Sequence, residues 1–570
     1  MIQSWLKHTL AIHYPGVNAD VLVPPDHKMG DYSTNIAFIL AKQRGTSPVN
    51  LGHEIVAKLR GDKSISLMFG KLEVVAPGFI NFTLKPDYIR KQLANVHNQG
   101  HAYGRSTLGK GKKVIVEYSS PNIAKPMHIG NIRSAIIGDA LANIYNFIGY
   151  KVIRWNYLGD WGTQFGKLIA AYKKWGNKKE VERDPIPTLL KLYVRFHEEI
   201  KTNLELEQDG QEEFHKLETG NKENQKLLKW FRAESLKGFN RLYDILGIKF
   251  NVINGESDFE KDLQPLVDYL LQEKIAERSE GAIIIKLEQF NLPPMMIQKS
   301  DGSSVYHTRE IVSLQKRLDG YDPVKIMYVV ANQQSLHFQQ LFVVAQLLGL
   351  TTSELVHVKF GFVLGADGQK MATREGKIIS AEEVIAKVTR LAREVVEKKN
   401  SSLSEKEKDR IAEAVGIGAL KYNDLMEHRN SDVVFDWNRM LSFSGNSGPY
   451  LQYTYARLAS IRRKSGRSFF RRFLTPNLNL LETEQELRLM RYLLDFPETI
   501  RRSADQYVTN NIALYLYELA NLANRFYESV RILDDKNTKR RDARIFLIEA
   551  VIGVLRNGLG LLGIKTLERI

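Results

Sequence analysis

Apolar residues recur every three to five positions between residues 129 and 148, a spacing that places them on one buried face of a long helix. A short apolar run at 114–116 precedes this helix, and a strand-like pattern follows it at 151–157. The three segments predict a strand, helix, strand unit. Such units are typical of parallel sheets that are covered by helices.

The turn that opens the predicted helix carries polar residues with potential chemistry. Lys125 and His128 lie at the helix N-terminus, where free N–H groups and the positive end of the dipole attract phosphate. His128 and Asn131 are three residues apart and project from one side of the first turn. We therefore expect a nucleotide-sized site here, although a lone His-x-Gly-Asn is more often a capping or surface histidine.

The chain before this unit has the pattern of a small α/β domain. Helical spacing at 2–12 and 33–42 and an alternating strand at 79–84 predict this domain over residues 1–105. A linker rich in Gly and Lys follows at 101–113.

The chain after the unit is predicted to complete the sheet and then to become helical. Residues 167–283 are helical and highly charged, which is typical of solvated faces. Strands expected at 282–287, 326–330 and 357–364 would complete a doubly wound parallel sheet in a domain spanning 106–385. Helical spacing dominates 386–570 and predicts a bundle, most clearly at 411–425, 483–494, 511–530 and 542–562.

Composition narrows the class of protein. The chain has 570 residues, 43% of them hydrophobic, which is enough for two to four packed domains. Its formal net charge of +16 favours a large polyanion as partner. Because no apolar run could span a bilayer and the N-terminus lacks the apolar core of a signal peptide, we expect a soluble cytoplasmic protein. The absence of cysteine excludes disulfides and thiolate zinc sites, and no zinc is expected.

A second motif far downstream favours a functional role for His128 over that of a capping or surface histidine. The stretches HIGN at 128–131 and KMATR at 370–374 resemble the paired H-I-G-H and K-M-S-K-S motifs of class I aminoacyl-tRNA synthetases. The sequence elsewhere in the chain narrows the family, because three stretches resemble arginyl-tRNA synthetases: SSPNIAKPMHIGNIRS at 119–134, GDWGTQFG at 159–166 and SGPYLQYTYARL at 447–458. The resemblance spans nearly the whole chain.

The resemblance implies a Rossmann-like class I catalytic domain between a small N-terminal domain that contacts tRNA and a C-terminal anticodon-binding bundle. The charged stretch at 167–283 would be the insertion that splits the nucleotide fold. The implied reaction attaches L-arginine to tRNA(Arg) through an arginyl-adenylate, with ATP as substrate and Mg²⁺ as its counter-ion. Neither step requires a protein nucleophile, so catalysis would depend on positioning and on stabilising charge at phosphate oxygens. We expect a monomer with no dedicated protein-held metal.

The same resemblance assigns catalytic and ATP-binding residues. His128 and Asn131 would lie near the phosphates and ribose of ATP, with Gly130 letting the nucleotide approach the backbone. His337 would lie near the adenosine, and Lys370 would contact the pyrophosphate end.

The second motif departs from the family pattern, because Thr373 replaces its second lysine. Lys125 is expected to supply the missing positive charge near the α-phosphate. The alternative is that Lys125 is a solvated loop lysine.

An arginine pocket needs acids for the planar guanidinium and a polar anchor for the α-amino group. The resemblance assigns this pocket to six residues: Glu117 and Asn122 near the amino group, Glu256, Tyr306 and Glu310 at the guanidinium end, and Gln334 in the wall. Relatives commonly carry aspartate at the position of Glu310. Either the pocket backbone shifts to fit the longer acid, or Glu256 carries more of the recognition.

Two groups of residues are expected to contact tRNA. Phe79 and Asn81 match positions that meet a D-loop base, although a core role for Phe79 is equally compatible with the sequence. The second group, with aromatic and guanidinium groups at helical spacing, resembles an anticodon-binding surface rather than the more usual core, and comprises Tyr450, Tyr453, Arg457 and Tyr527.

Two other functions compete with that of a synthetase. A non-catalytic tRNA-binding paralogue would keep the basic surface, but the presence of His128, Lys370 and the acidic pocket together argues against it. A different nucleotidyltransferase of the same fold would leave the C-terminal bundle unexplained.

Overall fold

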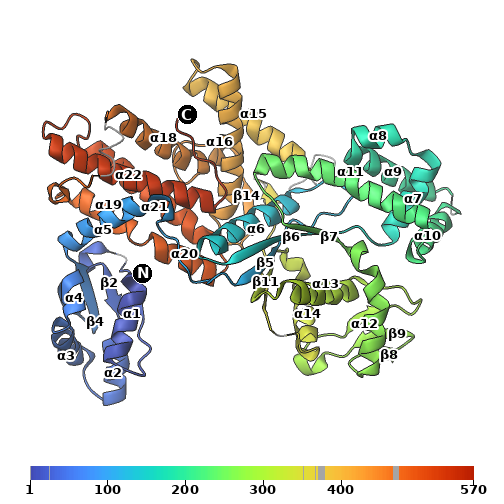
Figure 1. The fold of residues 1–570 in the computed structure, drawn as a ribbon, viewed down its shortest axis with the longest axis horizontal. Helices are drawn as coiled ribbons and strands as arrows, with labels where there is room; N and C mark the ends of the chain where they lie inside the picture. Colours follow the sequence, from blue (N-terminus) through green and yellow to red (C-terminus); the bar gives the residue numbers. More distant parts are fainter. Residues whose placement is uncertain are drawn as a thin grey trace.

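The chain folds around a five-stranded parallel sheet (Figure 1). The computed structural model describes residues 2–24, 26–203, 205–350, 352–365, 368–369, 379–466 and 474–570. The second motif at 370–374, with Lys370 and Thr373, lies outside the described residues. All neighbours in the sheet run parallel, in the order β12 (Glu354–His357), β11 (Lys325–Tyr328), β5 (Lys113–Glu117), β6 (Lys151–Leu158), β7 (Val252–Gly255).

Alternate residues of β5 face two different hydrophobic cores, because side chains alternate along a strand. Val114 and Val116 belong to a large core that includes α6 (Ile129–Phe147). Ile115 belongs to a second core that includes α12 (Glu260–Gln272), α13 (Tyr306–Tyr321) and α14 (Ser335–Leu347). Helices therefore cover both faces, and the predicted doubly wound parallel sheet is confirmed.

The order of the strands reverses between β5 and β11. From β5 the chain moves outward through β6 to β7, and it then returns to the other side of β5 with β11 and β12. Ligands in such sheets bind at the carboxyl ends of the strands beside this switch point. The strand order thus predicts a ligand site near the ends of β5 and β11.

A small domain precedes the sheet. Its four strands form an antiparallel sheet in the order β1 (Val21–Leu22), β2 (Tyr32–Thr34), β4 (Phe79–Leu84), β3 (Phe69–Val75). Its helices are α1 (Ile2–His13), α2 (Ile36–Arg44), α3 (Pro48–Arg60), α4 (Lys63–Met68) and α5 (Pro86–Gln99). The predicted α/β character of this region is confirmed.

A helical insertion leaves the sheet after β6 and returns to it at β7. Its described residues form α7 (Thr163–Trp175), α8 (Lys178–Arg183), α9 (Pro185–Ile200), α10 (Glu205–Glu218) and α11 (Lys222–Leu246). The long helix α11 runs from the insertion back towards the centre of the molecule (Figure 1). The chain re-enters the parallel sheet at Val252, earlier than the charge pattern predicts.

Two of the expected strands lie elsewhere than predicted. β9 (Ala282–Ile285) pairs antiparallel with β8 (Glu277–Ser279) and β10 (Met295–Gln298), so its assignment to the parallel sheet is wrong. The stretch at 357–364 is also not one strand, because β12 ends at His357 and β13 (Val363–Gly365) pairs with β14 (Val433–Phe435). Composition predicts that a segment is extended, but it does not specify the partner strand.

The C-terminal region is a helical bundle, as predicted. Its described helices are α15 (Ala381–Lys399), α16 (Glu405–Leu425), α17 (Trp437–Met440), α18 (Gly448–Lys464), α19 (Glu484–Leu493), α20 (Phe496–Asp505), α21 (Asn510–Ser529) and α22 (Thr538–Leu561). The bundle packs against the small N-terminal domain (Figure 1). The hydroxyl of Tyr103, for example, donates to the carbonyl of Leu493 at 2.9 Å.

Candidate active site

His128 caps the N-terminus of α6. Its Nδ1 accepts the N–H of Gly130 at 3.1 Å, and the side-chain oxygen of Asn131 accepts the N–H of His128 at 3.1 Å. A Cβ at residue 130 would lie 2.9 Å from the imidazole Cε1, so glycine is needed for the ring to lie there. The residues of the first motif thus hold one another at the start of the helix.

Capping also fixes the protonation of the imidazole. Because Nδ1 accepts a hydrogen bond, the neutral ring carries its proton on Nε2. Burial lowers the pKa of His128 below its usual value, which favours the neutral form at pH 7. The side chain is exposed, so Nε2–H can donate to an anionic oxygen at the positive end of α6.

The loop between β5 and α6 has an unusual backbone. Ser119, Ser120 and Ala124 have φ values of 75°, 43° and 62°, which residues with a Cβ adopt only at a cost. Side chains from outside the loop stabilise this conformation. The hydroxyl of Ser134 accepts the N–H of Ser119 at 2.9 Å, and the hydroxyls of Ser119 and Tyr243 lie 2.8 Å apart.

Lys125 lies on the same loop and is half-buried rather than fully solvated. Its ammonium lies 5.3 Å from the ring centroid of Tyr193 on α9, within the range of a cation–π interaction. The insertion therefore contributes an aromatic surface on which this lysine rests.

Residues 380 and 381, downstream of the second motif, contact the residues of the first motif. The N–H of Ala381 donates to the carbonyl of Met127 at 2.8 Å, and Ser380 pairs with His128 in an isolated antiparallel bridge. The start of α15 is thus joined to the start of α6.

Acidic side chains gather where the parallel strands end. Glu117 ends β5, and it lies opposite Tyr328, which ends β11. Tyr306 and Glu310 lie in the first turns of α13, and Tyr306 acts to lower the pKa of Glu310 against the effect of burial. Glu256 directly follows β7 and acts electrostatically on Glu310. The three acids therefore form one cluster near the carboxyl ends of the parallel strands, which we call the acidic pocket.

The floor of this acidic pocket contains an arginine of the chain itself. Nη2 of Arg317 lies 2.5 Å from Oε2 of Glu117, with side-chain exposures of 0% and 3%. The guanidinium also lies 4.8 Å from the ring centroid of Trp155. Sequence reasoning missed Arg317, although its spacing of seven residues from Glu310 puts both on one face of α13.

The pKa values of the pocket acids are strongly raised. Burial raises the pKa of Glu310 to about 8, with a further increase from Glu117 that Arg317 opposes. Burial also raises the pKa of Glu256 to about 7, and Arg309 opposes this shift. Acids that bind protons near neutral pH are typical of sites that await a cationic partner.

Histidine side chains form another wall of the acidic pocket. The ring centroids of Tyr306 and His337 lie 4.7 Å apart, and His307 stacks on His337 at 5.0 Å. Burial lowers the pKa of His337 to about 3, so this ring is neutral at pH 7. Gln334, in contrast, lies exposed just before α14. Sequence reasoning did not identify His307, and only its position next to Tyr306 could have suggested it.

Asn122 lies between the first-motif loop and the turn that follows β6. It forms an isolated parallel bridge with Gly159, whose N–H donates to the carbonyl of Pro121 at 3.1 Å. The two turns are therefore connected at the edge of the acidic pocket.

Buried polar atoms without a hydrogen-bond partner are concentrated in this pocket. Buried polar groups are normally paired in folded proteins, so such a concentration indicates a place for a polar ligand. Oε2 of Glu117 and Nη2 of Arg317 face each other in their ion pair. The other side chains concerned are Trp155, Tyr157, His307, Glu310, Ser313, Tyr328 and His337, with Nε and Nη1 of Arg317.

The two residues expected to meet a D-loop base lie on one face of β4. Phe79 is 38% exposed and packs edge-on against Phe38, with ring centroids 5.0 Å apart. Asn81 is buried two residues further along the strand. The core alternative for Phe79 is therefore wrong, since a large part of its ring remains exposed.

The four residues expected at the anticodon form one cluster on α18 and α21. The guanidinium of Arg457 lies 4.9 Å from the ring centroid of Tyr453 and 5.7 Å from that of Tyr527. The hydroxyl of Tyr450 donates to the side-chain oxygen of Asn521 at 2.8 Å. Tyr527 is exposed and the other three are half-buried, which leaves ring and guanidinium surface accessible to a partner.

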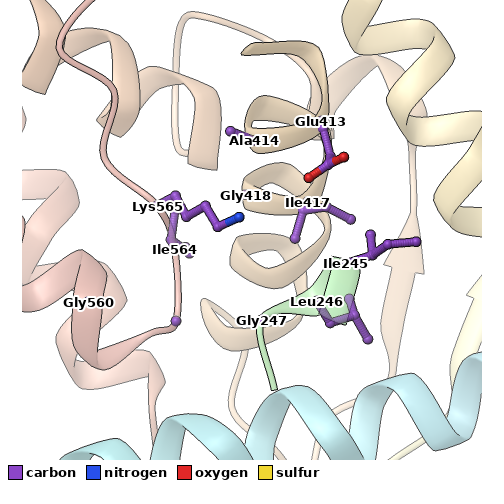
Figure 2. A pocket seen from close by; sticks show the side chains of 11 residues that line it. Ile245, Leu246, Gly247, Glu413, Ala414, Ile417, Gly418, Gly560, Ile564 and Lys565 are labelled. Carbon is purple, nitrogen blue, oxygen red and sulfur yellow. The ribbon is translucent and has the colours of Figure 1, made fainter. Parts of the chain in front are cut away.

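A separate pocket of about 250 Å³ lies away from these sites (Figure 2). It is bounded by the end of α11, by α16 and by the segment that follows α22, and its lining is mostly apolar. Glu413 and Lys565 are its charged lining residues. This pocket marks the place where α11 meets the C-terminal bundle.

Neither a metal cluster nor a membrane span is found in the described part of the chain. Its residues contain no group of three or more His, Asp or Glu side chains that could hold a metal ion. None of its helices combines the length and the apolar character that a membrane span requires.

Family models match three consecutive parts of the chain. Residues 1–84 match the arginyl tRNA synthetase N terminal domain, residues 92–437 the catalytic domain of tRNA synthetases class I (R), and residues 451–570 the DALR anticodon binding domain.

Whole proteins of known identity match as well. The arginine–tRNA ligase of Halothermothrix orenii is 43% identical, covering 96% of this chain and 95% of that protein, and the arginine–tRNA ligase of Ligilactobacillus salivarius is 41% identical with the same coverage. The crystal structure of arginyl-tRNA synthetase from Plasmodium falciparum has a TM-score of 0.82 at 26% identity, covering 100% of this chain and 98% of that one. The Thermus thermophilus arginyl-tRNA synthetase has the same fold, with a TM-score of 0.83 at 24% identity over the full length of both chains.

Proposed function

This chain belongs to the arginyl-tRNA synthetase family, and we propose how its residues divide the work of that reaction. The protein is an arginine–tRNA ligase. In the first step the carboxylate of arginine attacks the α-phosphorus of ATP, which gives arginyl-adenylate and pyrophosphate. In the second step a ribose hydroxyl at the 3′ end of the tRNA attacks the acyl carbon and releases AMP.

ATP binds with its phosphates at the start of α6. The Nε2–H of His128 donates to a phosphate oxygen at the positive end of the α6 dipole, and Asn131 lies beside it. Gly130 lets the nucleotide approach the backbone, and His337 meets the adenosine. Lys370 contacts the pyrophosphate end. Magnesium enters with ATP as its counter-ion, since the phosphates themselves supply the oxygen ligands that Mg²⁺ prefers.

Lys125 supplies the positive charge that the second motif lacks at Thr373. Its half-buried position beside Tyr193 supports this role, because a cation in a partly desolvated place acts more strongly than one in water. As pentacoordinate phosphorus forms, the charge on the α-phosphate oxygens increases. A lysine there lowers the barrier of adenylate formation.

Arginine binds in the acidic pocket between β5 and β11. Its guanidinium lies between Glu310, Glu256 and Tyr306, and entry of this cation lets both acids ionise. The remaining proposed contacts are Asn122 and Glu117 for the α-amino group and Gln334 for the wall.

The tRNA contacts the protein at both ends. The cluster on α18 and α21 offers stacking surfaces to splayed anticodon bases. Its members are Tyr450, Tyr453, Arg457 and Tyr527. Phe79 and Asn81 meet a base at the outer corner of the tRNA. The enzyme works as a monomer in the cytoplasm, where its tRNA substrate is used in translation.

The observation that carries the arginine site is the group of buried, unpaired polar atoms around Glu310, together with the raised pKa values of Glu310 and Glu256. We expect Glu256→Gln to raise the KM for arginine roughly 10²-fold, because a charge-assisted pair becomes a neutral contact worth about 3 kcal/mol less. Arginine-dependent exchange between ATP and pyrophosphate measures this directly. The KM for ATP should change less than about twofold.

Glu273→Gln is the matched control, because Glu273 is exposed beyond the end of α12. Near-normal dependence on arginine in Glu256→Gln would show that this carboxylate does not bind the substrate.

A further inference from the structure

Glu256 lies between two backbone N–H groups that are each held by a carboxylate. The N–H of Gly255 donates to Oδ2 of Asp258 at 2.8 Å. The N–H of Ser257 donates to Oδ1 of Asp160 at 2.9 Å, and the Ser257 hydroxyl donates to Oδ2 of Asp160 at 2.8 Å. The backbone is therefore fixed on both sides of Glu256.

One guanidinium joins these two carboxylates. Arg232 donates to both oxygens of Asp258, at 2.8 and 3.0 Å, in a bidentate pair that sets orientation as well as distance. Nη1 of Arg232 also donates to Oδ2 of Asp160 at 3.3 Å, and Nη2 donates to the carbonyl of Ile253 at 3.3 Å. Arg232 lies on α11, so a helix of the insertion completes this network.

This hydrogen-bond network restricts the position of the turn that carries Glu256. Asp160 is fully buried, and burial raises the pKa of its carboxyl group against the opposing effects of Ser257 and Arg232. A Cβ added to Gly255 would lie 2.1 Å from Oδ2 of Asp160, so a side chain there would displace the carboxylate. The turn that carries Glu256 thus has one arrangement that satisfies all of its polar groups.

We propose that Arg232 is a positioning residue for arginine recognition, which fixes the backbone of Glu256 through Asp160 and Asp258. This inference rests on the proposed function of Glu256. Arg232 does not touch the substrate, and it acts by keeping the Glu256 carboxylate at the guanidinium end of the acidic pocket. A carboxylate displaced by even 1 Å loses much of a directional, charge-assisted hydrogen bond.

Arginine-dependent exchange between ATP and pyrophosphate tests the proposal with Arg232→Gln and Asp258→Asn. Each variant should raise the KM for arginine about tenfold or more while the KM for ATP stays within about twofold. Arg232→Lys should fall between these variants and the unchanged protein, because an ammonium keeps the charge but loses the bidentate fork. Arg241→Gln, on an exposed part of the same helix, is the control and should behave normally.

A double-mutant cycle separates positioning from a general structural role. If Arg232 acts through Glu256, the variant with both Arg232→Gln and Glu256→Gln should have the KM for arginine of Glu256→Gln alone. Multiplicative effects would overturn the proposal, as would equal increases in the KM for arginine and for ATP. If Arg232→Gln does not fold, the nearly isosteric Asp258→Asn carries the same cycle.

The single variants also distinguish this inference from the function on which it rests. A normal KM for arginine in Glu256→Gln would remove the proposed arginine contact itself. A raised KM in Glu256→Gln together with normal values in Arg232→Gln and Asp258→Asn would overturn only the positioning role.

Discussion

The guanidinium of Arg317 lies 2.5 Å from the carboxylate of Glu117, and neither side chain is exposed by more than 3%. This ion pair neutralises one of the three acids of the pocket from within the chain. Glu310 and Glu256 keep raised pKa values despite the positive charges of Arg317 and Arg309, and these are the two acids whose charge we propose a bound arginine balances. The pair also gives Glu117 a structural role in addition to its proposed contact with the α-amino group.

The first prediction separates these two roles of Glu117. Glu117→Gln leaves the buried Arg317 uncompensated and should lower the free energy of unfolding by about 3–5 kcal/mol. The combined Glu117→Gln and Arg317→Met variant should recover much of that loss, since both charges are then absent. Urea unfolding measures the difference. If Glu117→Gln instead unfolds normally and only raises the KM for arginine, its main role is direct binding.

The second prediction concerns pH. A carboxyl group whose pKa is higher in the folded state binds more protons when folded, so its contribution to stability is present below the unfolded pKa and is lost as pH rises from the unfolded to the folded pKa. Because burial raises the pKa of Glu256 from 4.5 to about 7 and that of Glu310 from 4.5 to about 8, the free protein should lose stability as pH rises from about 4.5 to about 8, and little more above that. Arginine balances the ionised acids, so the rise in Tm that it causes should grow over the same interval.

Glu310→Gln provides the control for this pH dependence. Its difference in Tm from the unchanged protein should vary across the same interval, because the glutamine cannot titrate. Thermal melts with and without arginine at each pH measure both effects. A difference that stays constant from about pH 4.5 to about 8 would show that the pKa of Glu310 is not raised in the folded protein.

The third prediction concerns Lys125. A cation that acts mainly on charge in the transition state should, when removed, lower kcat with little change in KM. Lys125→Ala should therefore reduce the kcat of adenylate formation by roughly 10²- to 10³-fold. Adding Thr373→Lys should restore part of the rate. Near-normal activity of Lys125→Ala would indicate that Arg374 or magnesium already supplies the charge.

The fourth prediction concerns the surface on α18 and α21. Arg457→Ala removes a half-buried guanidinium between Tyr453 and Tyr527 and should raise the KM for tRNA several-fold, with a change in Tm of no more than about 2–4 °C. Arg390→Ala, an exposed arginine on α15, serves as control. A large fall in Tm with normal use of tRNA would mean that the cluster serves packing alone.

Much of the fold follows from the sequence because its strongest signals are local. The apolar spacing at 129–148 predicts α6, and the spacing in the last third of the chain predicts the bundle, since helical periodicity needs no information about partners. The segment at 282–285 is extended as predicted, but it joins another sheet, because pairing depends on contacts distant in sequence.

The candidate site was predictable only in part for a related reason. Motif residues such as His128 are contiguous, so their spacing alone indicates a shared turn. Arg317 and Arg232 carry no motif, and each becomes meaningful only when folding brings it to an acid far away in the sequence. Asp160, within GDWG, is part of a recognisable motif, yet its role depends on the helix that supplies Arg232.

The alternation along β5 has a consequence for how the chain reaches its native state. Val114 and Val116 face one core, whereas Ile115 faces the other, on the side where Glu117 meets Arg317. A shift of β5 by one residue would turn Glu117 towards the large apolar core, with no guanidinium to receive it. The ion pair of Glu117 and Arg317 thus also discriminates against misregistered sheets, because a chain folded with the wrong strand register leaves both buried charges without a partner.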